Sequence, residues 1–153
     1  KNDVEFPGTM FSITGYSSTG KSTASALAVS IAGNPTKGNN TLFRSWNGTR
    51  NALEGYLSQN FGLPIVLDEL SAATFKSTTG LLYSIAEGQG RQRANIHGGV
   101  KSLKNWGTSV ISTAEHSIFN NSARNDGLNV RTIEISEAFT RSADNADAIK
   151  KET

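Results

Sequence analysis

The chain has 153 residues, a formal net charge of +2, two histidines and no cysteine. We interpret residues 1–153 as one domain, since this length can bury a substantial core. Disulfides and thiolate metal sites are excluded, and His97 and His116 alone cannot form a zinc centre. No apolar run approaches the length of a membrane span and no signal peptide is visible, so we expect a cytoplasmic protein without a membrane partner.

The first predicted element is a buried strand over residues 10–14, and the segment GYSSTGKST follows it directly. This segment matches the P-loop pattern G-x-x-x-x-G-K-[ST] at every position. The glycines permit a tight turn whose N–H groups converge on phosphate oxygens in front of a helix N-terminus. Lys21 is expected to reach the β- and γ-phosphates of ATP, and the Ser22 hydroxyl to bind Mg²⁺. The predicted nucleotide-binding residues of the loop are Gly15, Ser17, Ser18, Thr19, Gly20, Lys21, Ser22 and Thr23.

A helix is predicted over residues 21–32, ending near Gly33 and Pro35. Its expected buried face follows the spacing i, i+3, i+4, i+7 and consists of Ala24, Leu27, Ala28 and Ile31. A strand, a glycine-rich loop and a helix form the context that the motif requires. This context favours nucleotide binding over the alternative, a Ser- and Gly-rich turn that happens to precede a helix.

The next predicted elements are a strand over 41–46 and a helix over 50–60, capped by Asn47 or Thr49. The residues predicted to be buried on this helix are Leu53, Tyr56 and Leu57. A second buried strand is predicted over 64–68, in the segment LPIVLDEL.

Two acids follow this apolar run, at the carboxyl end of a predicted parallel strand. Asp68 is expected to hold Mg²⁺ together with Ser22, and to belong to the ATP site. Glu69 is expected to orient and activate the attacking water. Acids also cap strand ends for structural reasons, but a complete P-loop earlier in the chain favours the functional interpretation.

The remaining predicted elements are a helix over 77–86, a strand over 108–113 and a last strand near 130–135. The alternation of strands and helices predicts an α/β fold, a parallel sheet with helices on both faces. A polar side chain on the strand beside the acidic pair is expected to contact the γ-phosphate or the water. Thr113 or Ser112 is the candidate, and ordinary strand-end hydroxyls are the alternative.

A basic segment, RQRANIHGGVKSLKNW, precedes the strand over 108–113. No acidic residue occurs between Gly88 and Thr113. The Gly-Gly pair between short apolar stretches predicts a β-hairpin over 91–105. Arg93, Lys101 and Lys104 are expected to contact the backbone of single-stranded DNA, because phosphate contacts need cations and no base readout. The alternative is a solvated surface ribbon.

In this order the motifs resemble the ATPase domain of Cch-like helicases of plasmids, phages and staphylococcal cassette chromosomes. The resemblance covers about residues 11–135 and depends on six segments: GYSSTGKST, SWNGTRNALEG, IVLDEL, YSIAEGQGRQRA, NWGTSVISTAEHS and GLNVRTIEI. It implies an AAA+ P-loop ATPase of the ASCE type, related to the MCM replicative helicases. It also implies a homo-oligomeric ring, which we expect to be a hexamer. In such a ring a hairpin grips DNA, and it precedes the strand that carries the sensor residue, here the strand over 108–113.

The resemblance implies in addition an arginine that acts in trans on the neighbouring subunit's γ-phosphate. Arg131 matches it, and Arg124 is the second candidate. AAA+ motors carry a C-terminal helical lid, and only 18 residues after the last predicted strand remain here, SEAFTRSADNADAIKKET. Because the chain also begins at a lysine, we expect a fragment of a longer protein with an absent or truncated lid.

The leading functional hypothesis is therefore an enzyme that couples ATP hydrolysis to movement along DNA in a mobile-element replication helicase, with Glu69, Thr113 and Arg131 as catalytic residues. A small-molecule kinase would share the P-loop, although Glu69 directly after Asp68 suits water activation better than transfer to an acceptor. A module that binds ATP only for assembly or recruitment is the other alternative.

Overall fold

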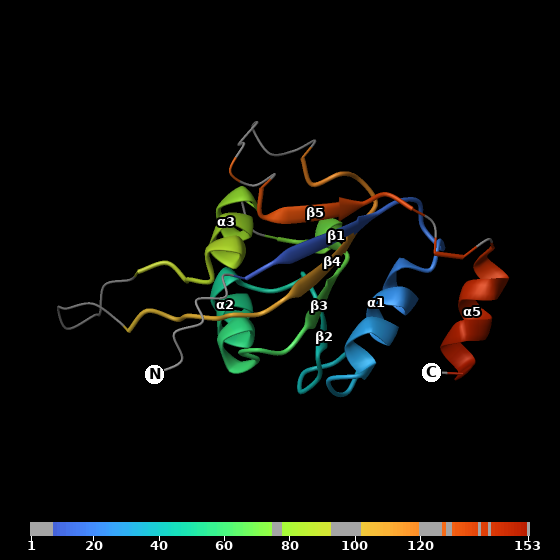
Figure 1. Ribbon diagram of the computed structural model, residues 1–153, viewed down its shortest axis with the longest axis horizontal. Helices are drawn as coiled ribbons and strands as arrows, with labels where there is room; N and C mark the ends of the chain where they lie inside the picture. Colours follow the sequence, from blue (N-terminus) through green and yellow to red (C-terminus); the bar gives the residue numbers. More distant parts are fainter. Residues whose placement is uncertain are drawn as a thin grey trace.

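The computed structural model of the chain describes residues 8–74, 78–92, 102–119, 127, 130–137, 139–140 and 142–152. Its centre is a five-stranded parallel sheet with the strand order β2-β3-β4-β1-β5 (Figure 1). The strands are β1 (Met10–Thr14), β2 (Phe43–Ser45), β3 (Ile65–Asp68), β4 (Val110–Ala114) and β5 (Thr132–Ile135). Since β4 lies between β1 and β3, the loop after β1 and the acids after β3 open at the same edge, one strand apart.

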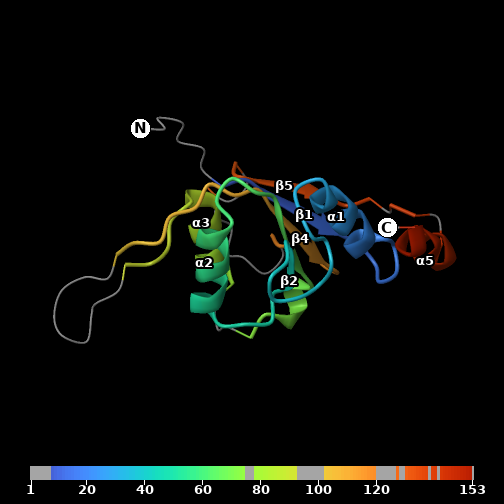
Figure 2. The same cartoon turned by 90° about the horizontal axis from the view of Figure 1, so that it is seen from below.

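The helices are α1 (Lys21–Ser30), α2 (Arg50–Gln59), α3 (Thr79–Glu87) and α5 (Ala143–Glu152), with a short 3₁₀ helix at Leu70–Ala72. Helices α2 and α3 lie on one side of the sheet and α1 lies on the other (Figure 2). The predicted α/β fold with helices on both faces is thus confirmed. The bounds of the predicted strands and helices lie within two residues of the observed ones.

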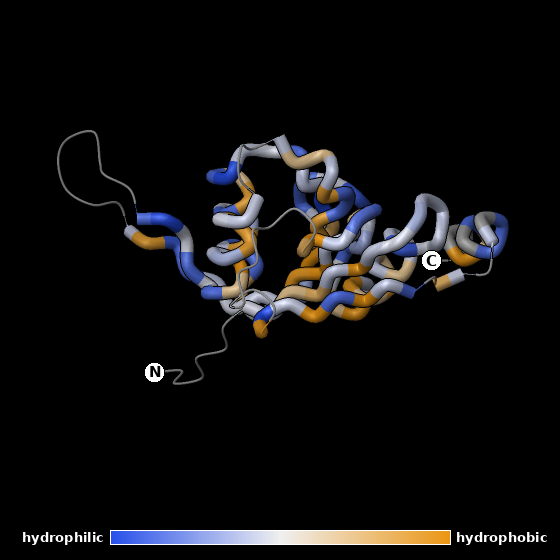
Figure 3. The backbone as a smooth tube through the Cα atoms, turned by 90° about the horizontal axis from the view of Figure 1, so that it is seen from above, coloured by the Kyte–Doolittle hydropathy of each residue, from blue (hydrophilic) through white to orange (hydrophobic). Residues whose placement is uncertain are grey.

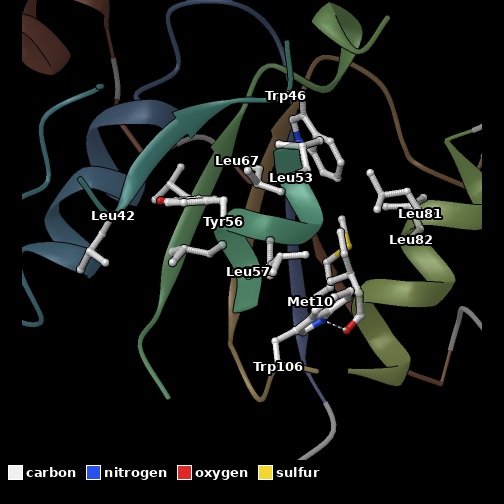
Figure 4. Packing of buried hydrophobic residues seen from close by; sticks show 14 of the residues in the cluster. Met10, Leu42, Trp46, Leu53, Tyr56, Leu57, Leu67, Leu81, Leu82 and Trp106 are labelled. Atoms are coloured by element: carbon white, nitrogen blue, oxygen red, sulfur yellow. Dashed lines mark hydrogen bonds between the residues drawn. The ribbon is translucent and has the colours of Figure 1, made fainter. Parts of the chain in front are cut away.

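The main core fills the space between the sheet and the helices α2 and α3 (Figure 4). Trp46 and Leu57 are fully buried there together with Met10 of β1. The predicted inward face of α2 is correct, because Leu53, Tyr56 and Leu57 are at most 4% exposed. Thr49 caps this helix, since its Oγ1 accepts a hydrogen bond from the Ala52 N–H at 3.3 Å.

The predicted inward face of α1 is wrong. Leu27 and Ile31 are 55% and 90% exposed, and the helix instead buries Lys21, Thr23, Ser25 and Val29. Ser25 satisfies its buried hydroxyl by donating to the Lys21 carbonyl oxygen at 2.8 Å. In the first turn, Lys21 donates to carbonyl oxygens of the loop after β1 and Ser22 donates to Asp68 at the end of β3. These contacts set the rotation of the helix, whereas the apolar stripe does not.

Helix α5 is absent from the predicted elements. It contacts α1, and the segment before it reaches the loop after β1. There, the Phe139 N–H donates to the Thr19 carbonyl oxygen at 3.1 Å. Within the described part of the chain, none of the helices is both long enough and apolar enough to span a bilayer.

Candidate nucleotide site

The loop between β1 and α1 adopts backbone conformations that favour glycine at two of its positions. Gly15 has φ +148° and Gly20 has φ +82°. A methyl group on Gly20 would also lie 2.8 Å from Thr140 Cγ2, because the chain after β5 packs on the loop. Residue 20 is thus restricted to glycine by its conformation and by this packing.

Lys21 begins α1 and is 9% exposed. Its ammonium lies inside the loop and donates to the carbonyl oxygens of Gly15 and Tyr16 at 2.8 and 2.6 Å. These contacts hold the positive charge in the concave side of the loop, where backbone N–H groups and the N-terminus of α1 also favour an anion. The arrangement is suited to a phosphate chain.

Asp68 ends β3 and is 7% exposed. Its Oδ1 accepts from Ser22 Oγ and from Thr113 Oγ1, each at 2.8 Å, and its Oδ2 accepts from Lys37 Nζ at 2.7 Å. Burial acts to raise the pKa of this carboxyl group, but hydrogen bonds from Lys37, Thr113 and Ser22 and the charge of Lys37 together hold the pKa below its ordinary value. Asp68 is therefore an anion that links α1, β4 and the loop containing Lys37.

Glu69 follows Asp68 with φ +66°, which is unusual for a residue with a side chain. Its N–H donates to Thr113 Oγ1 at 2.8 Å, which helps to stabilise this conformation. Its carboxylate accepts a hydrogen bond from Ser71 Oγ. Holding the turn in this conformation costs on the order of 1 kcal/mol, and such strain is common at functional sites.

The two hydroxyls proposed for the neighbouring strand lie on opposite faces of the sheet. Thr113 faces α1 and contacts both Asp68 and the backbone of Glu69. Ser112 faces the main core, where its Oγ accepts from Trp46 Nε1 at 3.0 Å. The geometry therefore favours Thr113 over Ser112 as the residue beside the acidic pair.

A cavity of about 250 Å³ lies in front of the loop after β1. Most of the predicted residues meet there, and the predicted residues that line it are Ser17, Ser18, Gly20, Lys21, Ser22, Thr23, Glu69 and Thr113. Two further acids line it, Glu115 after β4 and Asp147 of α5. Glu115 could be found in the sequence as an acid just past a strand end, whereas nothing in the local sequence predicts Asp147.

The oxygens of this site fit a magnesium ion that is bound largely by the nucleotide. Among the described residues, no group of three or more His, Cys, Asp or Glu side chains could hold a metal ion. Mg²⁺ usually keeps several waters and takes one or two protein oxygens plus substrate phosphates. The Ser22 hydroxyl and the Asp68 carboxylate are oxygens of this kind, next to each other.

Arg131 lies at the other end of the sheet from this cavity. It precedes β5, is exposed, and its carbonyl oxygen accepts from the Met10 N–H at the start of β1. The loop with the predicted nucleotide-binding residues follows the end of β1, about 16 Å further along a strand of this length. Arg131 is therefore not placed to contact a nucleotide in its own subunit. Arg124, the second candidate, lies outside the described residues.

The described ends of the basic segment run side by side and lead away from the sheet, on the side opposite α1 and α5 (Figure 1). Gln89 and Asn105 form an antiparallel bridge, and the Gly90 N–H donates to the Lys104 carbonyl oxygen at 2.8 Å. Figure 3 colours most of these two arms as hydrophilic. Lys104 is exposed, and its Nζ lies 3.4 Å from the Asn51 carbonyl oxygen of α2. Arg93 and Lys101 lie outside the described residues.

Replacing Lys21 by methionine is expected to weaken the binding of ATP by about 10- to 100-fold, because two or more charge-assisted hydrogen bonds to phosphate are lost. A fluorescent ATP analogue titrated into both proteins measures the change. Lys151→Met, on α5, removes the same charge elsewhere and is the control. If Lys21→Met bound the ATP analogue as tightly as the parent protein does, the loop would not be the nucleotide-binding loop that the motif predicts.

The strand order, the loop after β1 and the acids after β3 define a P-loop NTPase of the AAA+/ASCE type. Residues 2–105 match the family described as "Domain of unknown function (DUF927)", and the chain belongs to this family.

A solved structure described as "SCCmec type IV Cch - active helicase" is 70% identical to the chain, with a TM-score of 0.82. The match covers 97% of this chain and 26% of the helicase, so the chain spans about a quarter of that protein's length. The resemblance to Cch-like helicases that the motifs predict is thus confirmed. No curated protein matches the chain.

Proposed function

We propose that the chain is the ATP-hydrolysing motor domain of a DNA replication helicase of a mobile genetic element. The observation that carries this proposal is that Lys21, Ser22, Glu69 and Thr113 line one cavity. Asp68 lies directly beside it, because it accepts hydrogen bonds from Ser22 and Thr113. The 70% identity to a protein described as an active helicase supports the same activity.

In the proposed reaction, Lys21 and the backbone of the loop bind the β- and γ-phosphates. Ser22 and Asp68 would hold Mg²⁺, which would supply positive charge against the charge that develops on the phosphates. Glu69 accepts the proton of the attacking water, and Thr113 keeps Glu69 in place through its backbone N–H. Arg131 of a neighbouring subunit in a homo-oligomeric ring, expected to be a hexamer, stabilises the transition-state charge.

The basic segment is the proposed contact to single-stranded DNA. Its two arms leave the domain from the edge of the sheet opposite the phosphate-binding loop, at the C-terminal end of α3 and before β4. Trp106 anchors the second arm, since its N–H donates to the Gly88 carbonyl oxygen at 2.8 Å and its Nε1 donates to the Ile85 carbonyl oxygen at 3.3 Å. A change in the segment beyond these anchors should therefore alter DNA binding without altering ATP binding.

Phosphate release with and without single-stranded DNA tests the proposed activity. A motor domain hydrolyses ATP faster when DNA is present, whereas an assembly module or a small-molecule kinase does not respond to DNA. A parent protein that binds ATP but shows no hydrolysis with or without DNA would contradict the motor and leave the assembly module.

Replacing Lys101 by alanine is expected to weaken binding to single-stranded DNA of every sequence alike. The slope of log affinity against log salt should become shallower by about 0.7 for each lost phosphate contact. Fluorescence anisotropy at several salt concentrations measures both effects, and DNA stimulation of the ATPase should fall while ATP affinity persists. Lys151→Ala, on α5 at the other end of the molecule, is the charge-matched control. If Lys101→Ala bound single-stranded DNA with the parental affinity and the parental salt dependence, Lys101 would not be part of the DNA contact.

A further inference from the structure

Lys37 contacts the acidic centre of the site, although it belongs to neither the P-loop pattern nor the acidic pair. Its Nζ lies 2.7 Å from Asp68 Oδ2. The Lys37 side chain is 52% exposed, whereas that of Asp68 is only 10% exposed. A half-exposed cation thus neutralises a buried carboxylate that is also the candidate magnesium ligand.

The position of Lys37 is determined by the connection between α1 and β2. Lys37 forms a parallel bridge with Phe43, the first residue of β2, and the Gly38 N–H donates to the Phe43 carbonyl oxygen at 3.0 Å. The ammonium also lies 6.0 Å from the centroid of the Phe43 ring. Because β2 is the neighbour of β3, these contacts place the loop beside the end of β3, where Asp68 lies.

The two oxygens of Asp68 have different partners. Oδ1 accepts from two neutral hydroxyls, those of Ser22 and Thr113, and Oδ2 accepts from the charged Lys37. A metal ion held by Ser22 needs the negative charge of this same carboxylate, either directly or through its water shell. The ammonium and a divalent cation therefore require the same anion and repel each other.

We propose that Lys37 is a built-in counterion that competes with magnesium for Asp68, so that binding of the metal releases the Lys37 side chain. This inference rests on the proposed ATP site. The Lys37 ammonium can leave Asp68, because half of its side chain already contacts solvent.

The test compares Lys37→Gln, which removes the charge, with Lys37→Arg, which keeps it, and with Lys151→Gln as a charge-matched control on α5. The first measurement adds magnesium without nucleotide and records the melting temperature. Its result is the magnesium concentration that gives half of the metal-induced rise in melting temperature. The second is the magnesium concentration that half-saturates the binding of a fluorescent ATP analogue. In Lys37→Gln both concentrations should fall by roughly threefold to tenfold, the scale of a partly exposed charged contact. Lys37→Arg and Lys151→Gln should match the parent protein.

Lys37→Gln should also melt at a lower temperature in EDTA, because the buried carboxylate loses its counterion, and added magnesium should restore much of this loss. An unchanged or higher magnesium requirement in Lys37→Gln would overturn the proposal. The measurement with magnesium alone separates this proposal from the proposed function, since it needs neither ATP binding nor hydrolysis. A parent protein that binds no ATP analogue would contradict the proposed function and leave the magnesium result to decide the role of Lys37.

Discussion

Replacing Arg131 by alanine is expected to slow ATP hydrolysis by about 10³-fold or more while ATP affinity stays unchanged, because arginines supplied in trans contribute on this scale. Arg131 is exposed and precedes β5, at the end of the sheet away from its own phosphate-binding loop. Its side chain is therefore available to an adjacent subunit. Phosphate release under saturating ATP, together with titration of an ATP analogue, measures the two quantities separately.

Mixing experiments sharpen this prediction. If the proposed ring forms, Arg131→Ala subunits are expected to bind ATP without completing a neighbour's site, so increasing amounts should lower the activity of rings that contain parental subunits. Arg124→Ala is the matched comparison, since Arg124 is the second candidate for the same role. Loss of ATP binding in Arg131→Ala would instead mean that the residue acts within its own subunit or stabilises the fold.

Replacing Glu69 by glutamine is expected to slow hydrolysis by about 100-fold or more, the usual scale for a lost general base. ATP should bind with parental affinity, because Lys21 and the loop backbone are unchanged. Glutamine has nearly the same shape, and the backbone N–H of residue 69 can still donate to Thr113 Oγ1. A single-turnover measurement of phosphate release, with ATP binding followed in parallel, isolates the chemical step.

The structure offers a control for Glu69 in the same cavity. Glu115 also lines it but follows β4, whereas Glu69 follows β3 and its backbone is held by Thr113. Glu115→Gln should keep most of the parental rate. If Glu115→Gln lost activity and Glu69→Gln did not, the general base would be Glu115.

The sequence predicts those parts of the protein whose signals are local. The motif from Gly15 to Ser22 requires a particular backbone conformation, and the predicted strand over 10–14 coincides with β1. In the apolar run before Asp68, the part that forms β3, Ile65, Val66 and Leu67, is fully buried. The alternation of short apolar strands with helices was enough to predict the α/β fold class, since parallel strands are usually connected by helices.

The tertiary structure decided which side of each element faces the site. Leu27 and Ile31 have the spacing of a buried stripe, yet they are exposed, because the loop sets the rotation of α1. Ser112 and Thr113 are equivalent in the sequence, and only the faces of β4 distinguish the partner of Trp46 from the partner of Asp68.

Lys37, Glu115 and Asp147 reach the site from three separate parts of the chain. Lys37 follows α1, Glu115 follows β4, and Asp147 belongs to α5. The spacing of residues along the chain can predict which face of a single helix or strand is buried. It cannot predict the positions of these three residues, because they depend on contacts between residues far apart in sequence. For this reason the sequence determines the glycine-rich loop after β1 and the acidic pair after β3, and the packing of the sheet determines which other charges surround them.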